Sequence, residues 1–449
     1  MTLQQLLRSA DTSLDETVAL LSDLVRIASV NGGPEGPGNE SEVARLLAAK
    51  LAADGVASQL LEARPNRGNL VARLDGGSAP SLLYMGHTDV VPAEDAELWR
   101  YPPFAGTVAE GYVHGRGAAD CKALVACETM ALLILARQHV PLAGSLILAA
   151  GADEETGGQH GFAWLARHHP EAIRADCAIN EGGGSPFFVG GRKGYLINTG
   201  EKGRLEASLR LDGKGGHAAT PWAADNPIER LPELLMGLRR HQIVPDLSHP
   251  IFEVTSEVFQ SSLTRLLQVD FGDLSRSERG LVSALRGASR MTITPTMLLG
   301  GVKSNSIPAS CSVVCDVRTL PGQTAADVMA EIRAALGKVE SVQIELQETA
   351  EPSESPYPTP FSQAIERATA AAVEQPDLLW IPGLTSGFSD SRLVRPLGTT
   401  VYGFAPQSAD PDALTPEGIH GRDECMPIES LRVTLRMLVA LAWDMLVAH

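Results

Sequence analysis

Apolar and polar positions alternate with two different periods in the first part of the chain. Apolar residues recur with a helical period at 14–28 and 122–138, whereas 81–86, 144–150 and 176–180 are short, nearly continuous apolar runs. Such runs are typical of strands that are buried on both faces. We therefore expect an α/β fold with a mixed, largely parallel sheet covered by helices. Further helices are expected at 40–54 and 158–168, and further strands at 69–74 and 106–114.

The pattern changes at about residue 200. From there the sequence predicts, in order, a strand at 204–211, a helix at 227–239, strands at 291–298 and 311–317, a helix at 325–336 and a strand at 341–347. The order βαββαβ is that of a compact, ferredoxin-like α+β domain. Residues 241–289, between its first helix and its second strand, are interpreted as an insertion.

A proline-rich segment at about 351–360 returns the chain to the first pattern. Helices are expected at 361–373 and 428–447, with a turn region between them. We therefore predict two domains. They are a discontinuous domain formed by 1–199 and 351–449, and a second domain formed by 200–350.

Composition and charge narrow the class of protein. Hydrophobic residues make up 44% and charged residues 20% of the 449 residues, as in an ordinary globular protein. The formal net charge of -17 argues against nucleic acid or an anionic membrane as a partner. The six cysteines form no CxxC pair, and the chain has neither a secretory signal pattern nor an apolar run long enough to span a bilayer. We expect a cytoplasmic protein.

A histidine and an aspartate follow the apolar run at 81–86. His87 stands at the predicted end of the strand and Asp89 stands two residues later, so both side chains point the same way in an extended segment. A carboxylate in that place can orient the imidazole of a metal ligand. The alternative is a structural histidine that binds nothing.

Other acidic residues also stand where predicted strands end. Glu154 and Glu155 follow one predicted strand and Glu181 follows the next. Asp120 lies in a glycine-rich turn before a predicted helix, and His420 lies in a late loop. Carboxylates gathered at the carboxyl edge of a sheet repel one another unless positive charge lies between them, and a pair of divalent ions would supply it. Taken singly, each acid is instead a solvated loop residue or a helix cap.

Five segments together resemble the signature of the M20 metallopeptidase family, which includes aminoacylase-1, carboxypeptidase S, desuccinylases and glutamate carboxypeptidases. They are Gly86–Pro92, Gly117–Lys122, Asp153–Gly157, Asn180–Gly183 and His420–Glu424, in the order of the family. The resemblance implies that the discontinuous domain is a catalytic metallohydrolase domain. It implies that the second domain is a lid through which the protein forms a homodimer.

The resemblance also implies a dinuclear metal site. Asp120 would bridge two divalent ions, with zinc as the first choice and cobalt or manganese as alternatives. His420 and Glu155 would complete one metal site. His87 and Glu181 would complete the other.

Further roles follow from the same resemblance. Glu154 would be the general base that takes a proton from a metal-activated water, and Asp89 would orient the metal-ligating histidine beside it. His217, in the lid, would reach the active site of the partner subunit and stabilise the developing oxyanion. A histidine in an ordinary turn is the alternative for this position.

Three more residues match positions that contact the substrate in the family, or are candidates of the same kind. They are Asn305, Arg318 and Arg392. Arg318 suits a substrate carboxylate because a guanidinium binds it with two hydrogen bonds. A structural ion pair with Asp316 is the alternative.

These expectations describe a metal-dependent hydrolase that cleaves the amide bond of a dipeptide or an N-acyl amino acid with a free carboxylate. The form of Asn180–Gly183 looks closer to the aminoacylase-1 and carboxypeptidase S branch than to the desuccinylases. One alternative is a hydrolase of another C–N bond in a non-peptide metabolite. Another is a non-catalytic metal-binding scaffold, which would have lost the base or a ligand.

Overall fold

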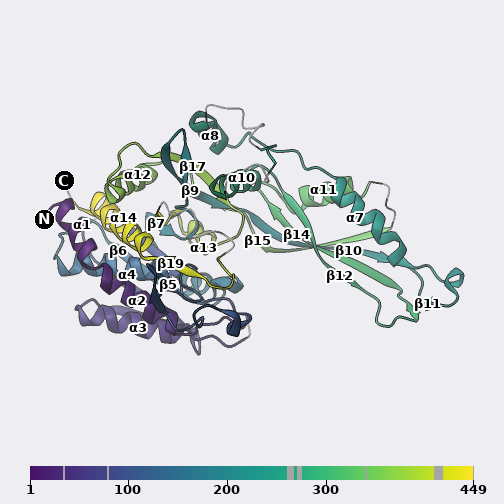
Figure 1. Ribbon diagram of the computed structural model, residues 1–449, viewed down its shortest axis with the longest axis horizontal. Helices are drawn as coiled ribbons and strands as arrows, with labels where there is room; N and C mark the ends of the chain where they lie inside the picture. The colour runs from purple at the N-terminus through teal and green to yellow at the C-terminus, as the bar shows by residue number, and fades with distance from the viewer. Residues whose placement is uncertain are drawn as a thin grey trace.

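The computed structural model shows an elongated molecule with two unequal lobes (Figure 1). It describes residues 1–33, 36–77, 80–259, 267–270, 276–337, 339, 341–408 and 418–447. The larger lobe contains both termini, and the smaller lobe extends away from it. No helix in the described part of the chain is long and apolar enough to cross a bilayer.

A ten-stranded mixed sheet forms the centre of the larger lobe. Its main path, in spatial order, is β1 (Ser58–Arg64), β2 (Arg67–Leu74), β6 (Leu146–Gly151), β3 (Leu82–His87), β7 (Cys177–Asn180), β18 (Thr400–Gly403), β9 (Arg192–Glu201) and β16 (Ser353–Glu354). Two more strands, β8 (Pro186–Val189) and β17 (Leu379–Thr385), pair with β9. The four central strands β6, β3, β7 and β18 are parallel, which confirms the predicted sheet.

Helices cover both faces of this sheet. One face is covered by α1 (Leu3–Thr12), α2 (Leu14–Arg26), α3 (Glu40–Ala53), α4 (Lys122–Arg137), α12 (Pro360–Val373) and α14 (Ile428–Leu446). The other is covered by α5 (Phe162–His168), α6 (Pro170–Ile173) and α13 (Ser391–Val394). In β3, Leu82 and Tyr84 pack on the first face, and Leu83 and Met85 on the second. Successive strand residues point to opposite faces, so a continuous apolar run is what a doubly covered strand requires.

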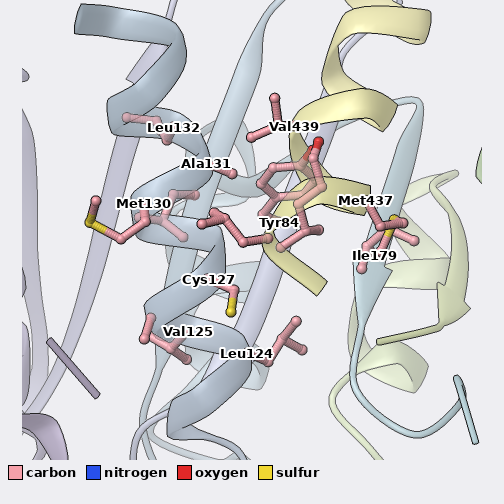
Figure 2. Close-up of a cluster of buried hydrophobic side chains, with 14 of the residues drawn as sticks. Tyr84, Leu124, Val125, Cys127, Met130, Ala131, Leu132, Ile179, Met437 and Val439 are labelled. Atoms are coloured by element: carbon pink, nitrogen blue, oxygen red, sulfur yellow. The ribbon is translucent and has the colours of Figure 1, made fainter. Parts of the chain in front are cut away.

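Helices α4 and α14 pack against β3 in the core beneath the sheet. Figure 2 shows the ring of Tyr84 between side chains of these two helices. Its hydroxyl donates to the backbone oxygen of Leu438, so the polar end of the ring is satisfied within the apolar layer. This packing fixes the strand that carries His87 at its end.

The smaller lobe is a four-stranded antiparallel sheet with helices on one face. The strand order is β12 (Thr292–Gly300), β14 (Ser310–Thr319), β10 (Gly203–Asp212) and β15 (Val342–Ala350), and the helices are α7 (Leu231–Arg240) and α11 (Ala325–Leu336). The chain order βαββαβ and this spatial order confirm the ferredoxin-like prediction. At one end, β11 (Gly216–His217) pairs with β13 (Ser306–Ile307).

The chain crosses between the two sheets at two adjacent points. Lys202 separates β9 of the large sheet from β10 of the small one, and Glu351 and Pro352 separate β15 from β16. Ser353 pairs with Glu201, so the outgoing and returning segments lie side by side. The division of the chain into two domains at these points stays a prediction.

The segment interpreted as an insertion returns to the larger lobe. Its helices α8 (Ile251–Phe259) and α10 (Arg276–Ala288) contribute to an apolar cluster with β8 and β17. Lys202 donates from Nζ to the backbone oxygens of Gly287 and Arg290, which ties the end of α10 to the crossing point. Residues 260–266 and 271–275 of this segment lie outside the described residues.

Some local predictions are wrong. The stretch 106–114 is two short strands, β4 (Thr107–Ala109) and β5 (Tyr112–His114), because Glu110 and Gly111 form a turn with positive φ angles. The expected turn region after α12 contains β17, α13, β18 and, before α14, β19 (Cys425–Pro427). The long strand β9 and the first helix α1 were not expected from the pattern.

Candidate active site

Parallel strands bring the acidic residues of the larger lobe to one edge. β3 ends at His87, which is in register with Gly151 at the end of β6. Glu154 and Glu155 follow β6, and Glu181 follows β7 on the other side of β3. The carboxyl ends of adjacent parallel strands meet at the same edge, where open α/β sheets form their sites.

Asp120 lies between the two histidines. Its Oδ1 is 2.9 Å from Nε2 of His87, and its Oδ2 is 3.1 Å from Nε2 of His420. Glu181 Oε2 lies 3.5 Å from Nε2 of His87, and Glu155 Oε1 lies 3.2 Å from Nε2 of His420. The five predicted ligands thus form two halves that share one carboxylate.

The electrostatics of this cluster favour bound positive charge. Hydrogen bonds to Asp120 and Glu155 raise the pKa of His420 to about 10. Burial opposes ionisation of Asp120, but its hydrogen bonds with His420 and His87 hold its pKa below the usual value. Imidazole nitrogens and carboxylate oxygens are donors that zinc, cobalt and manganese accept, so the donor set fits two divalent ions.

A thiol also lies close to the cluster. Cys121, His87 and Glu181 bring one donor atom each within 4.8 Å of one another. The backbone N–H of His87 donates to Sγ of Cys121 at 3.2 Å. Burial raises the pKa of this thiol well above its usual value. Cys121 therefore adds a buried thiol next to His87 and Glu181.

Asp89 connects the predicted ligand His87 to the loop of Glu154. Its Oδ1 lies 3.4 Å from Nδ1 of His87 and accepts the backbone N–H of Glu154 at 3.0 Å. Its Oδ2 accepts the backbone N–H of Glu155 at 3.1 Å and the side-chain amide of Asn31 at 2.7 Å. Asp89 therefore positions both halves of the site, and not the imidazole alone.

Asn31 is a positioning residue that the sequence alone does not indicate. From the loop after α2, its amide nitrogen reaches Asp89 and, at 3.2 Å, Asp153. Its Oδ1 accepts from the buried guanidinium of Arg67 at 3.1 Å. No local motif marks this residue, because its partners lie far away in the sequence.

A second pair holds the other half of the site. Arg116 donates to Oε2 of Glu424 at 2.5 Å, and both side chains are buried. Oε1 of Glu424 accepts the backbone N–H groups of Ala119 and Asp120 at 2.9 and 3.1 Å. Arg116 also donates to the backbone oxygen of His420 at 3.1 Å. The pair thus fixes the loops of both Asp120 and His420. In the sequence, only the position of Glu424 at the end of the segment His420–Glu424 indicated a role for it.

Glu154 lines a cavity of about 530 Å³ beside the cluster. Its carboxyl is buried, and burial, followed by the charge of Glu181, raises its pKa well above the usual value. A carboxyl with a raised pKa that faces a cavity is suited to proton transfer.

The predicted substrate residues do not all reach this cavity. Arg318 lines it, but its Nε also donates to Asp316 at 2.7 Å, so the predicted ion pair exists as well. Arg392 donates to the backbone oxygen of Gly157 at 2.9 Å and lies over the ring of Phe388. This contact places Arg392 against the loop that carries Glu154.

His217 and Asn305 lie together in the smaller lobe. The backbone N–H of Ala218 donates to the backbone oxygen of Asn305 at 3.1 Å, and the ring of His217 is exposed. The strand β11, which contains His217, is at the end of the lid away from the large sheet (Figure 1). Within one chain these two residues are therefore separate from the cluster around Asp120.

This sheet edge has one carboxylate shared by two histidines and a buried glutamate beside them. Such an arrangement is typical of the class of two-metal hydrolases. The model of the family described as peptidase family M20/M25/M40 matches residues 83–444. The chain belongs to this family, and it is an enzyme that hydrolyses amide bonds.

A curated relative and two solved structures illustrate the likeness. Succinyl-diaminopimelate desuccinylase of Methylobacterium radiotolerans is 31% identical over 427 residues, which cover 93% of each chain. The M20 family metallo-carboxypeptidase Sso-CP2 of Sulfolobus solfataricus has a TM-score of 0.73 at 18% identity, with 96% of this chain and 99% of that chain covered. Human carnosine dipeptidase 1 has a TM-score of 0.70 at 17% identity, with 99% of both chains covered.

The relatives by sequence and the relatives by structure carry different names. Eight curated relatives that match at 30–34% identity are all succinyl-diaminopimelate desuccinylases, whereas the form of Asn180–Gly183 favoured the aminoacylase-1 and carboxypeptidase S branch. The two structures are a carboxypeptidase and a dipeptidase, and at this identity they show the fold alone.

Proposed function

We propose that the protein is a dinuclear metallohydrolase that cleaves the amide bond of dipeptides or N-acyl amino acids with a free carboxylate. The observation that carries this proposal is the place of Asp120, whose two oxygens face His87 and His420 at 2.9 and 3.1 Å. Two divalent ions held there, zinc first and cobalt or manganese as alternatives, would lower the pKa of a shared water and polarise the scissile carbonyl.

Glu154 is the proposed general base. It takes the proton of the attacking water and delivers it to the nitrogen of the leaving amine. Hydrogen bonds from the backbone N–H groups of Glu154 and Glu155 to Asp89 fix the loop. The base is therefore held while its own carboxyl remains directed at the cavity.

The leaving half of the substrate is proposed to occupy the cavity beside Glu154. Arg318 and Arg395 line this cavity, and both are cations. Arg395 is already paired with Glu201 at 3.1 Å. Arg318 shares its charge between Asp316 and the cavity, so it is the proposed partner of the substrate carboxylate.

A homodimer through the lid is proposed from the exposed edge of the small sheet. Among the described residues, β12 pairs only with β14, and its outer part is exposed. Met297, Leu298 and Leu299 on this strand are more than half exposed, at 53%, 61% and 51%. An unpaired apolar edge strand is a surface on which a second copy can add. In such a dimer His217 would serve the site of the partner subunit.

A cytoplasmic location is part of the proposal. All six cysteines lie in described parts of the chain and are free thiols. Free thiols on a chain of this size are typical of a reducing compartment.

The test is a screen with protein stripped by a chelator and reloaded with zinc, cobalt or manganese. Dipeptides and N-acyl amino acids should be hydrolysed, and the same compounds with an amidated carboxylate should be slower. Glu154→Gln should keep the metal content and lose about 10²–10⁴-fold in turnover. The neighbouring Glu155→Gln is the matched comparison, and it should lose metal. Equal activity of Glu154→Gln and the unaltered protein would refute the assignment of the base.

A further inference from the structure

A second pocket opens on the other side of the metal cluster. It has a volume of about 240 Å³ and shares Asp120, Glu181, Gly182 and Ile419 with the larger cavity. Glu154, Glu155 and Arg318 line only the larger cavity. The two spaces therefore share the wall that contains Asp120 and Glu181, and their other lining residues differ.

The wall of the second pocket is mainly apolar. Its apolar lining includes Ala123, Leu124 and Cys127 from α4 together with Ala405, Met426 and Leu431, and Ser185, Gln407 and Thr434 add uncharged polar groups. Burial raises the pKa of the Cys127 thiol, so this side chain is neutral as well. Among the described residues that line the pocket there is no lysine, arginine or histidine, and its only charged groups are Asp120 and Glu181.

The direction of proton transfer indicates which half of the substrate lies in which pocket. The base returns its proton to the leaving amine, so the amine half lies on the side of Glu154. The carbonyl carbon lies at Asp120, and the acyl half must then extend away from Glu154. We propose that the second pocket binds the acyl half, and that this enzyme takes a compact apolar acyl group in preference to an acidic one such as succinyl. This inference rests on the proposed function.

The size and the charge of the pocket support this preference. A cavity of about 150 Å³ lined by Leu, Ile and Phe is enough to bind benzene, so this pocket has room for a branched aliphatic or a phenyl group. A carboxylate placed against Leu124, Cys127 and Leu431 would be buried without a side-chain cation, which is unfavourable. The expected discrimination is at least about 100-fold in kcat/KM.

The experiment compares two N-acyl derivatives of the same amino acid with metal-loaded full-length protein. The acyl groups are 4-methylpentanoyl and succinyl, which have the same shape and differ by an isopropyl group in place of a carboxylate. The expected result is a kcat/KM at least about 100-fold higher for 4-methylpentanoyl. Equal rates, or a preference for succinyl, would overturn the pocket assignment and leave the proposed function standing. Hydrolysis of neither compound, nor of any dipeptide, would overturn both.

A charge placed in the pocket provides a second test. Met426→Lys adds a cation of similar length to the wall. The ratio of kcat/KM for the 4-methylpentanoyl compound to that for the succinyl compound should fall at least about tenfold. Met236→Lys on α7 is the matched control, since Met236 is 37% exposed in the lid, and its ratio should equal that of the unaltered protein. A well-folded Met426→Lys with an unchanged ratio would contradict the proposal. The comparison of the two substrates on the unaltered protein decides the matter if this variant does not fold.

Discussion

The backbone N–H of Glu154 donates to Oδ1 of Asp89 at 3.0 Å. Nδ1 of His87 lies 3.4 Å from the same oxygen and 3.0 Å from the backbone oxygen of Asp89, so one buried residue holds a proposed metal ligand and the loop of the proposed base together. Burial opposes its ionisation, but its hydrogen bonds, that with His87 foremost, keep the pKa of Asp89 below the usual value. The carboxylate is therefore charged, which makes it a strong acceptor for all of its partners.

Replacing Asp89 should impair the site without removing a ligand. In Asp89→Asn one oxygen becomes a donor, which repels the N–H group of either Glu154 or Glu155, since these donate to different oxygens of Asp89. Residues that orient metal ligands typically contribute 10–100-fold, so kcat/KM and metal affinity should fall by about that factor. Steady-state kinetics and metal titration measure both. Asp75→Asn, at an exposed position, is the control and should change neither. If kcat/KM and the metal affinity of Asp89→Asn equal those of the unaltered protein, the positioning role is excluded.

The buried pair of Arg116 and Glu424 should be important for the stability of the fold. Glu424→Ala leaves the Arg116 charge uncompensated and two N–H groups without their acceptor, at a cost of about 3–5 kcal/mol in the free energy of unfolding. Chemical denaturation measures this cost. The exposed pair of Arg100 and Glu110 provides the comparison, because Glu110→Ala should cost less than about 1 kcal/mol. Equal effects of the two substitutions would contradict this account.

Glu16 should make the stability depend on pH. It accepts from Arg137 at 2.7 Å and from Lys50 at 2.5 Å, and these bonds, that with Arg137 foremost, lower its pKa to about 2. A lowered pKa in the folded state stabilises the protein above pH 4.5, and this contribution is lost as the pH falls from 4.5 towards 2. Because the pair is partly exposed to solvent, Glu16→Gln should cost only about 1 kcal/mol at pH 7.

The pH dependence distinguishes this effect from a loss of packing. The difference in unfolding free energy between Glu16→Gln and the unaltered protein should narrow as the pH is lowered through 4.5. Glu97→Gln, at an exposed position in a short helix, should show no difference at any pH. A difference for Glu16→Gln that stays constant with pH would show that charge is not its cause.

The pattern of apolar residues predicted the central strands and helices because burial determines which positions are apolar. The runs that became β3, β6 and β7 are apolar on both faces, and α11 was predicted with its observed bounds, Ala325–Leu336. β9 was not predicted, because Arg192–Glu201 mixes charged, glycine and apolar residues at a place where the sheet is paired on several sides. Its strand structure depends on partners that lie far away in the sequence, and local pattern does not contain them.

The proximity of the proposed ligands could be predicted for a related reason. His87 is the last residue of β3, and Glu155 and Glu181 closely follow β6 and β7, so the parallel sheet alone brings them together. The contacts of Asn31 with Asp89 and Asp153 depend on the path of a loop, and no periodicity encodes a loop path. The apolar pocket could not be predicted from the sequence, for a different reason. Its wall residues in α4 and α14 have the pattern of ordinary core residues.

A role of His217 across subunits can be tested with mixed dimers. His217→Ala and Glu154→Gln should each be nearly inactive alone. In a mixed dimer, one site has an intact Glu154 from one chain and an intact His217 from the other, so random exchange should restore about a quarter of the activity. A mixture of Glu154→Gln and Glu155→Gln is the control, because both changes affect the same chain's site. Mixtures that remain inactive would place His217 outside the partner's site.

The central claim is that one carboxylate bridges two metal ions, and metal stoichiometry tests it most directly. Elemental analysis of the protein after reloading and dialysis should give two ions per chain, and Asp120→Asn should lose metal and hydrolysis together. Asp75→Asn should keep both ions. At most one ion per chain in the unaltered protein at saturating zinc, cobalt or manganese would contradict the account, as would full activity of Asp120→Asn.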